Sequence, residues 1–225
     1  MAGISTGINI LAANNFPLKH QLYNWYDFDL NLNSGTGGSS LVLTTDVNLV
    51  IPTYYDNNPS TPDPYVQLSH QTSTGSHPYI CNALKTFNVN NSLTIWVQHF
   101  PDSGRTSFTI LGVLNLDIDT GGTVVKNVST GATITTLGTG WHCFTIARNS
   151  SSTYQLSING NVLTQYTGTT GTEYFRKDAS PTTGLYVRID SMGIWDRLLD
   201  SVDVGNLYHS GAPLTYLELS NLIHF

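Results

Sequence analysis

Residues 154–166 read YQLSINGNVLTQY, and this stretch decides the fold class. Its first half alternates apolar and polar residues, which is the period of a half-buried β-strand. Asn159-Gly160 follows at once, and these two residue types tolerate the positive φ angles that a type I′ turn requires. The stretch therefore predicts a β-hairpin, with Val162 to Tyr166 as the returning strand.

Similar short segments recur along the chain, separated by glycine and other turn residues. Regular spacing of this kind is typical of a β-sandwich and not of alternating strands and helices. The three segments between residues 106 and 128 follow one another so closely that we expect a meander. Strands are expected at 41–45, 92–100, 106–111, 113–118, 123–128, 142–148 and, as one or two strands, within 185–195.

One helix is expected, over residues 202–209 near the C-terminus. Asp200 or Ser201 can cap its first turn, and Gly211 is placed to end it. Gly205 weakens the segment, so the helix should have no more than about two turns.

The composition favours one globular β-domain. The 225 residues are 40% hydrophobic and only 11% charged, with a net charge of −6. No basic cluster is present that could neutralise several phosphates, which argues against nucleic acid and anionic membranes as partners. No run approaches the roughly 18 apolar residues that insertion into a membrane requires. The segment from Met1 to Phe16 lacks the basic start of a signal peptide.

Cys81 and Cys143 are the only cysteines. A single pair is neither a disulfide framework nor a zinc pattern. Two interpretations stay open, namely two free buried thiols or one bridge.

Four segments, in this order, resemble the laminin-G-like and pentraxin-like branch of the concanavalin A-like lectin/glucanase superfamily. They are 26–29 with the Asn33-Ser34-Gly35 turn, SLTIWV at 92–97, GWHCFTI at 140–146, and VRIDSMGIWDRLL at 187–199 followed by Leu207-Tyr208. The resemblance implies an all-β, two-sheet antiparallel jelly-roll sandwich with one short helix near the C-terminus. It covers a domain at 23–212, between an N-terminal arm at 1–22 and a C-terminal tail at 213–225.

The same resemblance argues against an enzyme. Glucanases of this fold carry a Glu-x-Asp-x-x-Glu-like pattern on one strand, whereas this chain has only two glutamates, Glu173 and Glu218, both far from such a pattern. Asp117 and Asp119 are the nearest substitute for the two carboxyl groups of a glycosidase. We interpret both as water-facing residues at a strand end.

Structural roles are expected for the aromatic residues of the strands. The position of His142 in the Gly-Trp-His segment indicates a buried, hydrogen-bonded histidine and not a catalytic base. The tryptophans lie in strand patterns and are assigned to the core. They are Trp25, Trp96, Trp141 and Trp195.

Calcium is the one candidate cofactor, because sandwiches of this family often bind it through carboxylate and amide oxygens. Asp27 and Asp29 are the candidate ligands, and Asn31 and Asn33 continue the same alternation. The segment lacks the features of an EF-hand loop.

Two polar, aromatic loops are candidate glycan-binding sites, since sugars are recognised by aromatic faces and planar polar groups on loops. The alternative is that their tyrosines pack onto the sandwich or a neighbouring subunit. The candidate residues are Tyr54, Tyr55, Asp56, Asn57 and Asn58 in the proline-rich loop, and Tyr174 and Arg176 in the loop 167–183.

Together these observations predict a non-catalytic structural or adhesion protein on the surface of a virion, as a head decoration, fibre or tail adhesin. Its expected partners are other virion proteins, further copies of itself and cell-surface glycans. The alternatives are a free-standing cellular carbohydrate-binding or adhesion module, extracellular or at the cell surface, and, third, a glycoside hydrolase.

Overall fold

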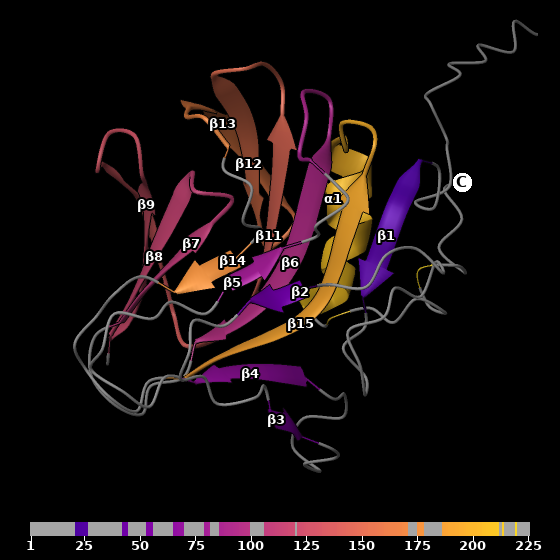
Figure 1. Cartoon of the computed structure of the whole chain (residues 1–225). Helices are drawn as coiled ribbons and strands as arrows, with labels where there is room; N and C mark the ends of the chain where they lie inside the picture. The colour runs from indigo at the N-terminus through magenta and orange to yellow at the C-terminus, as the bar shows by residue number, and fades with distance from the viewer. Residues whose placement is uncertain are drawn as a thin grey trace, which may run out of the picture.

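The computed structural model describes residues 21–26, 42–44, 53–55, 65–69, 79–81, 86–99, 106–119, 121–170, 175–177 and 186–211, with 213 and 219. These residues form two antiparallel sheets and a short α-helix near the C-terminus (Figure 1). The predicted fold class, an all-β two-sheet antiparallel sandwich with one short helix, is confirmed. The boundaries of the arm, the domain and the tail stay predictions.

The first sheet, sheet A, has the strand order β13-β12-β11-β6-β15-β4-β3, and β1 also pairs with β15. The region 185–195 forms one strand, β15, with a bulge at Ser191. The strands are β1 (Leu22–Tyr26), β3 (Thr53–Tyr55), β4 (Tyr65–Ser69), β6 (Ser92–His99), β11 (Gly140–Arg148), β12 (Thr153–Ile158), β13 (Asn161–Thr167) and β15 (Tyr186–Trp195).

The second sheet, sheet B, has the strand order β10-β9-β8-β7-β14-β5-β2. The predicted meander is confirmed as β7, β8 and β9, and β10 extends it by one strand. The strands are β2 (Val42–Thr44), β5 (Tyr79–Cys81), β7 (Thr106–Ile110), β8 (Leu114–Asp119), β9 (Gly122–Asn127), β10 (Thr133–Leu137) and β14 (Phe175–Lys177).

The main core lies between the two sheets. Alternate residues of the long strands point into it, as the period-two pattern predicts. Inward side chains of β6, β11 and β12 are buried here together with those of β7 and β8, among them Leu93, Phe144, Leu156 and Leu116. The largest contributors from the two sheets are Tyr26, Phe108, Phe144, Tyr154 and Phe175.

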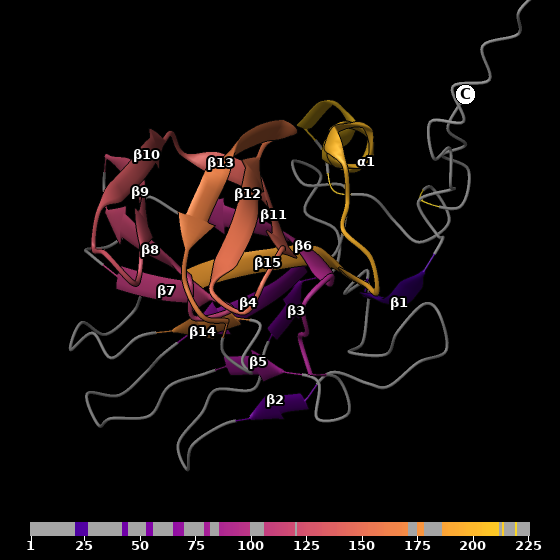
Figure 2. The same ribbon diagram turned by 90° about the horizontal axis from the view of Figure 1, so that it is seen from above.

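A second core lies on the outer face of sheet A, beneath helix α1 (Ser201–Tyr208). In Figure 2, sheet A lies between α1 and strands β14, β5 and β2 of sheet B. Trp25 and Trp195 meet edge to face, with their ring centroids 5.9 Å apart. Gly193 makes room for them, because a Cβ atom there would lie 2.3 Å from the Trp195 ring.

Helix α1 has the predicted length but begins and ends one residue earlier than predicted. The Asp200 carboxylate caps it by accepting bonds from the backbone N–H groups of Val202 and Asp203. The α-helix ends before Gly211, and a 3-10 turn over His209–Gly211 follows it and ends at the predicted glycine. His209 is the C-cap, in the left-handed conformation at φ 39°, so the helix stops two residues before the glycine.

The hairpin predicted at Asn159-Gly160 is confirmed. The two residues have φ angles of 50° and 78°, as a type I′ turn requires. A Cβ atom on Gly160 would lie 3.1 Å from the Cβ of Tyr208. The turn therefore packs closely against the last residue of α1.

Candidate ligand-binding face of sheet A

Helix α1 covers only part of the outer face of sheet A. Tyr208 at its end stacks on Trp96 of β6, with ring centroids 5.8 Å apart and planes inclined by 7°. Trp96 is fully buried by this contact, and Trp195 by the second core, so both predicted core assignments are confirmed. Trp96 pairs in register with Cys143 of β11. Residues that follow Trp96 on β6, or that precede Cys143 on β11, lie beyond the stacked rings of Trp96 and Tyr208.

Three half-buried side chains with planar groups form a row on that remaining part. Trp141 of β11 pairs with Gln98 of β6, and Gln98 pairs with Arg188 of β15. Their inward-facing neighbours, such as Val97 and Ile189, belong to the main core, so the row lies on the outer face. Arg188 Nη1 donates to Gln98 Oε1 at 3.0 Å, which fixes the guanidinium beside the amide.

The register continues the row onto the last two strands of sheet A. Arg188 pairs with Gln67 of β4, and Gln67 pairs with Thr53 of β3. With neighbouring strands about 4.8 Å apart, the five strands span about 19 Å. The face that carries the row therefore extends over all five strands.

The predicted residues Tyr54 and Tyr55 lie in β3, at the edge of this same sheet. The prediction of a continuous surface loop from Pro52 to Tyr65 is wrong at its start, because residues 53–55 pair with β4. Asp56, Asn57 and Asn58 lie outside the described residues.

The second predicted loop is also interrupted by a strand. Arg176 lies in β14, where it pairs with Tyr79 of β5 and Thr109 of β7. It thus belongs to sheet B, and the structure does not bring it to Tyr54 and Tyr55. Tyr174 lies outside the described residues.

Two corrections concern β11. Trp141 was predicted to be core but is half-buried, because it lies at the start of the strand, two residues beyond the Trp96–Cys143 pair. His142 was predicted to be buried and hydrogen-bonded, and only the hydrogen bonding is confirmed. Its Nε2–H donates to Gly138 O at 2.8 Å, and its Nδ1 accepts from Asn159 Nδ2 at 3.1 Å.

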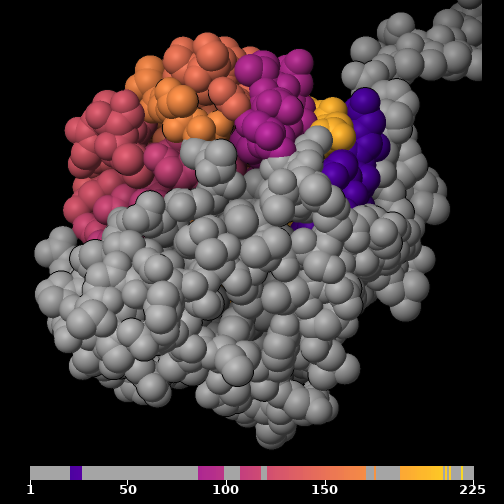
Figure 3. All heavy atoms as spheres, in the orientation of Figure 1, coloured from indigo at the N-terminus to yellow at the C-terminus, as the bar shows by residue number. Residues whose placement is uncertain are grey.

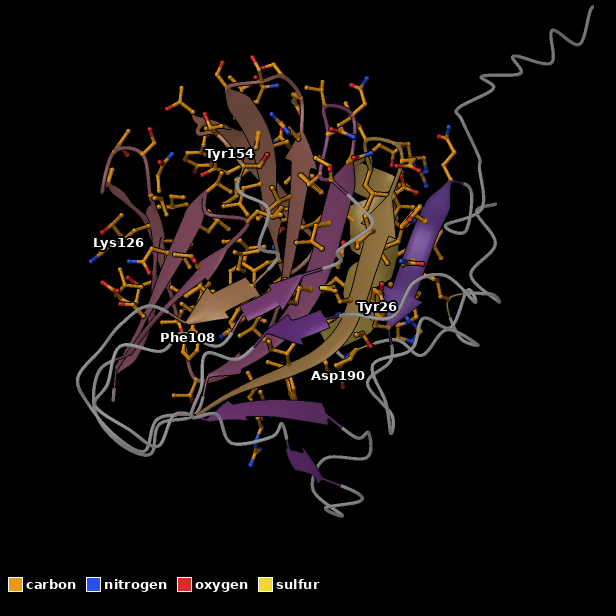
Figure 4. All side chains as sticks on the ribbon, in the orientation of Figure 1. Tyr26, Phe108, Lys126, Tyr154 and Asp190 are labelled. Carbon is orange, nitrogen blue, oxygen red and sulfur yellow. The ribbon has the colours of Figure 1, made fainter. Side chains whose placement is uncertain are left out.

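Asp117 was predicted to face water, and this is wrong. The residue is 6% exposed, because side chains of the two neighbouring strands close over it. Lys126 Nζ lies 2.5 Å from its Oδ2, and Ser107 Oγ donates to its Oδ1 at 2.5 Å. Figure 4 shows Lys126 projecting from the sheet B meander. The Asp119 side chain and both glutamates lie outside the described part, so no carboxylate pair is assigned.

The described part of the chain contains neither a metal-binding cluster nor a membrane-spanning helix. No group of three His, Cys, Asp or Glu side chains gathers there in a way that could hold a metal ion. The calcium candidates Asp27 and Asp29 lie outside the described residues, as do Asn31 and Asn33. None of the helices in the described ranges is long and apolar enough to cross a bilayer.

Cys143 is a free, buried thiol, as one of the two interpretations required. Burial raises the pKa of this thiol far above its usual range, and a hydrogen bond with Thr145 opposes the shift only in part. A protonated thiol is a poor nucleophile and metal ligand. Cys143 therefore acts as a small core residue.

The row of Trp141, Gln98 and Arg188 was missed by sequence reasoning. Gln98 and Arg188 do occupy the polar positions of alternating strands, which is a local sign of an outward direction. Their approach to one another depends on the pairing of β6, β11 and β15, which are distant in sequence. No local pattern specifies that pairing.

The fold and this row define a class: a two-sheet β-sandwich with a half-buried row of planar side chains on the outer face of one sheet. No protein-family model matches the sequence, and no curated protein matches it either. Solved structures do match, and several are receptor-binding domains of botulinum neurotoxins. The binding domain of mosaic serotype C/D is 14% identical with a TM-score of 0.52, covering 86% of this chain and 52% of that chain.

Two further similar structures are complexes. The binding domain of botulinum neurotoxin DC with SialylT is 14% identical with a TM-score of 0.53, and that with rat synaptotagmin II is 12% identical with a TM-score of 0.54. Each match covers 86% of this chain and 52% of that chain. The chain thus spans about half the length of these structures, and the similarity concerns the fold.

Proposed function

We propose that the chain is a non-catalytic adhesion module that binds carbohydrate along the row of Trp141, Gln98 and Arg188. The observation that carries the proposal is the alignment of an aromatic ring, an amide and a guanidinium across three adjacent strands. Aromatic faces with a few fixed planar polar groups are the usual means of orienting a small ligand. The hydrogen bond between Arg188 and Gln98 holds two of these groups in place before any ligand arrives.

The similar structures support a receptor-binding role for this fold. Domains that contain a similar fold were solved with SialylT and with rat synaptotagmin II. Within this proposal the chain belongs to the laminin-G-like branch of the concanavalin A-like superfamily. It acts on the exterior of a virion, together with other virion proteins and with copies of itself.

Glycan binding is tested by comparing the wild-type chain with Trp141→Ala on a glycan array and by calorimetry with any glycan found. Loss of the indole contact should weaken binding about tenfold or more, because a fully buried aromatic side chain contributes about 1.5–3 kcal/mol. Val128→Ala is the matched control, since Val128 is an exposed residue at the other end of the strands. Equal glycan binding by wild type and Trp141→Ala would contradict the proposed site.

The virion location needs a separate test. Antibodies against the chain should label the outside of purified particles, and the protein should remain with those particles through a density gradient. Recovery of the chain only as a free protein or in a cellular fraction would favour the cellular carbohydrate-binding module.

A further inference from the structure

The end of the sandwich at which β6 begins and β15 ends carries exposed aliphatic side chains. Val89, Leu198 and Val202 are 41%, 40% and 58% exposed. Hydrogen bonds hold their segments together: Asn91 Nδ2 donates to Asp196 Oδ1 at 2.9 Å, and the backbone N–H of Leu199 donates to Ser92 Oγ at 3.0 Å. We call Val89, Leu198 and Val202 the apolar patch. In Figure 3 the magenta, yellow and indigo atoms lie side by side at this end.

The charges around the apolar patch are arranged asymmetrically. Arg197 turns inward and pairs with Asp203, and the two side chains are only 14% and 4% exposed. Asp196 and Asp200 on either side are exposed. The surface is therefore apolar with an acidic border. Contact between two such patches would bring like charges together, which is unfavourable.

The N-terminal segment of the chain leaves the sandwich at this same place. The backbone N–H of Asp196 donates to Gln21 O at 2.8 Å, and Leu22 pairs with Trp195. Residues 1–20 read MAGISTGINILAANNFPLKH. They contain no acidic residue, six large aliphatic or aromatic residues after Met1, and a cation at Lys19. This chemistry complements the apolar patch and its acidic border.

We propose that the apolar patch is the docking site for residues 1–20 of a second copy of this chain. A reciprocal exchange between two copies covers both patches, and exchange of identical segments is a low-cost route to a dimer. Docking at the apolar patch does not depend on the proposed glycan site.

The first test is the mass of the full-length chain by light scattering over a range of concentrations. The wild type should associate, and Val202→Asp should weaken association about tenfold or more by placing a charge in the apolar contact. An acidic residue in the first turn is favourable to a helix, so this variant should fold. Val162→Asp is the matched control, because Val162 is 43% exposed on the edge strand β13, with β12 and β11 between it and β6.

A charge exchange distinguishes docking between copies from docking within one chain. Lys19→Asp and Asp196→Lys should each associate more weakly than wild type, since each places like charges at the contact. An equimolar mixture should regain association, because each arm then meets an opposite charge on the other variant. A monomeric wild type, unchanged association of Val202→Asp, or a mixture no better than its components would overturn the proposal.

Discussion

At the scale of single residues, Asn159 joins the hairpin turn to the neighbouring strand through both ends of its side chain. Its Oδ1 accepts from the backbone N–H of Cys143 at 2.9 Å, and its Nδ2 donates to His142 Nδ1 at 3.1 Å. Because the amide oxygen is held by a backbone donor, the amide nitrogen must face the histidine. This fixes the neutral His142 tautomer with its proton on Nε2.

Two substitutions at Asn159 should separate the turn from the side-chain bonds. Asn159→Gly keeps the positive φ and loses two hydrogen bonds, so it should lower the free energy of unfolding by about 1–3 kcal/mol. Asn159→Ala also places a Cβ residue in the left-handed region, at a further cost of about 1–2 kcal/mol. Urea unfolding of both variants measures the difference. Equal losses would show that the turn imposes no backbone strain on alanine.

The Tyr154 hydroxyl makes the free energy of unfolding depend on pH in the alkaline range. Burial, and secondarily the nearby Tyr166, raises the pKa of its hydroxyl well above the ordinary value near 10. Above pH 10 the unfolded chain releases this proton while the folded chain keeps it, so the free energy of unfolding falls as pH rises.

Tyr154→Phe removes this proton and also the hydrogen bond to Val113 O at 3.3 Å. The variant should be less stable by about 1 kcal/mol at pH 8, and the gap should narrow towards pH 11. Urea midpoints at both values check this. A gap that is the same at both values would mean that Tyr154 ionises equally in the two states.

At the scale of elements, helix α1 is short, and a glycine in its interior lowers its stability. Gly205 is exposed in its interior, and a Cβ atom there would meet no atom within 4 Å. Gly205→Ala should therefore stabilise the protein by about 0.5–1 kcal/mol, because alanine loses less backbone freedom on folding. Thermal unfolding measures the gain, with Gly193→Ala as the opposite case, since its Cβ would collide with Trp195.

The elements also show where sequence reasoning succeeds. The hairpin at Asn159-Gly160 and the meander β7–β9 were predicted because neighbouring strands and turn residues specify them locally. Strands β3 and β14 were missed because each is three residues long and lies in a polar or proline-rich segment. Only their pairing with strands elsewhere in the chain makes them part of a sheet.

Side-chain direction was predictable along strands but not across them. Alternation places Phe144 and Ile146 on one face of their strand, and both are buried in the main core. It could not tell that α1 covers Trp96 and leaves Trp141 half-buried, because that depends on where the helix ends over the sheet. It likewise missed the partners of Asp117, which come from β7 and β9.

Two of the edge strands, β13 of sheet A and β10 of sheet B, carry bulges. One extra residue of β13 lies opposite β12, and one extra residue of β10 lies opposite β9. Bulges at edges hinder pairing with another chain. Association through these edges is thus unfavourable, which is consistent with contact between copies at the apolar patch.

At the scale of the whole molecule, the two proposed surfaces lie at opposite ends of the same strands. Ser92 and Trp195 mark the end with the apolar patch, and Gln98 and Arg188 mark the other. Gln98 lies six positions after Ser92 along β6, which corresponds to about 20 Å. Association through the patch would therefore leave the row of planar side chains accessible on every copy.

This separation predicts different effects on affinity and avidity when residues 1–20 are removed. Strand β1 starts at Leu22 and keeps its pairing with Trp195, so the shortened chain should fold and be a monomer by light scattering. Its affinity for a soluble monovalent glycan should equal that of wild type, because the row is untouched. On a surface dense in the same glycan, retention should fall about a hundredfold or more, since linked sites gain that much from a second contact. Loss of affinity for the soluble glycan would instead show that the N-terminal segment contributes to the binding face itself.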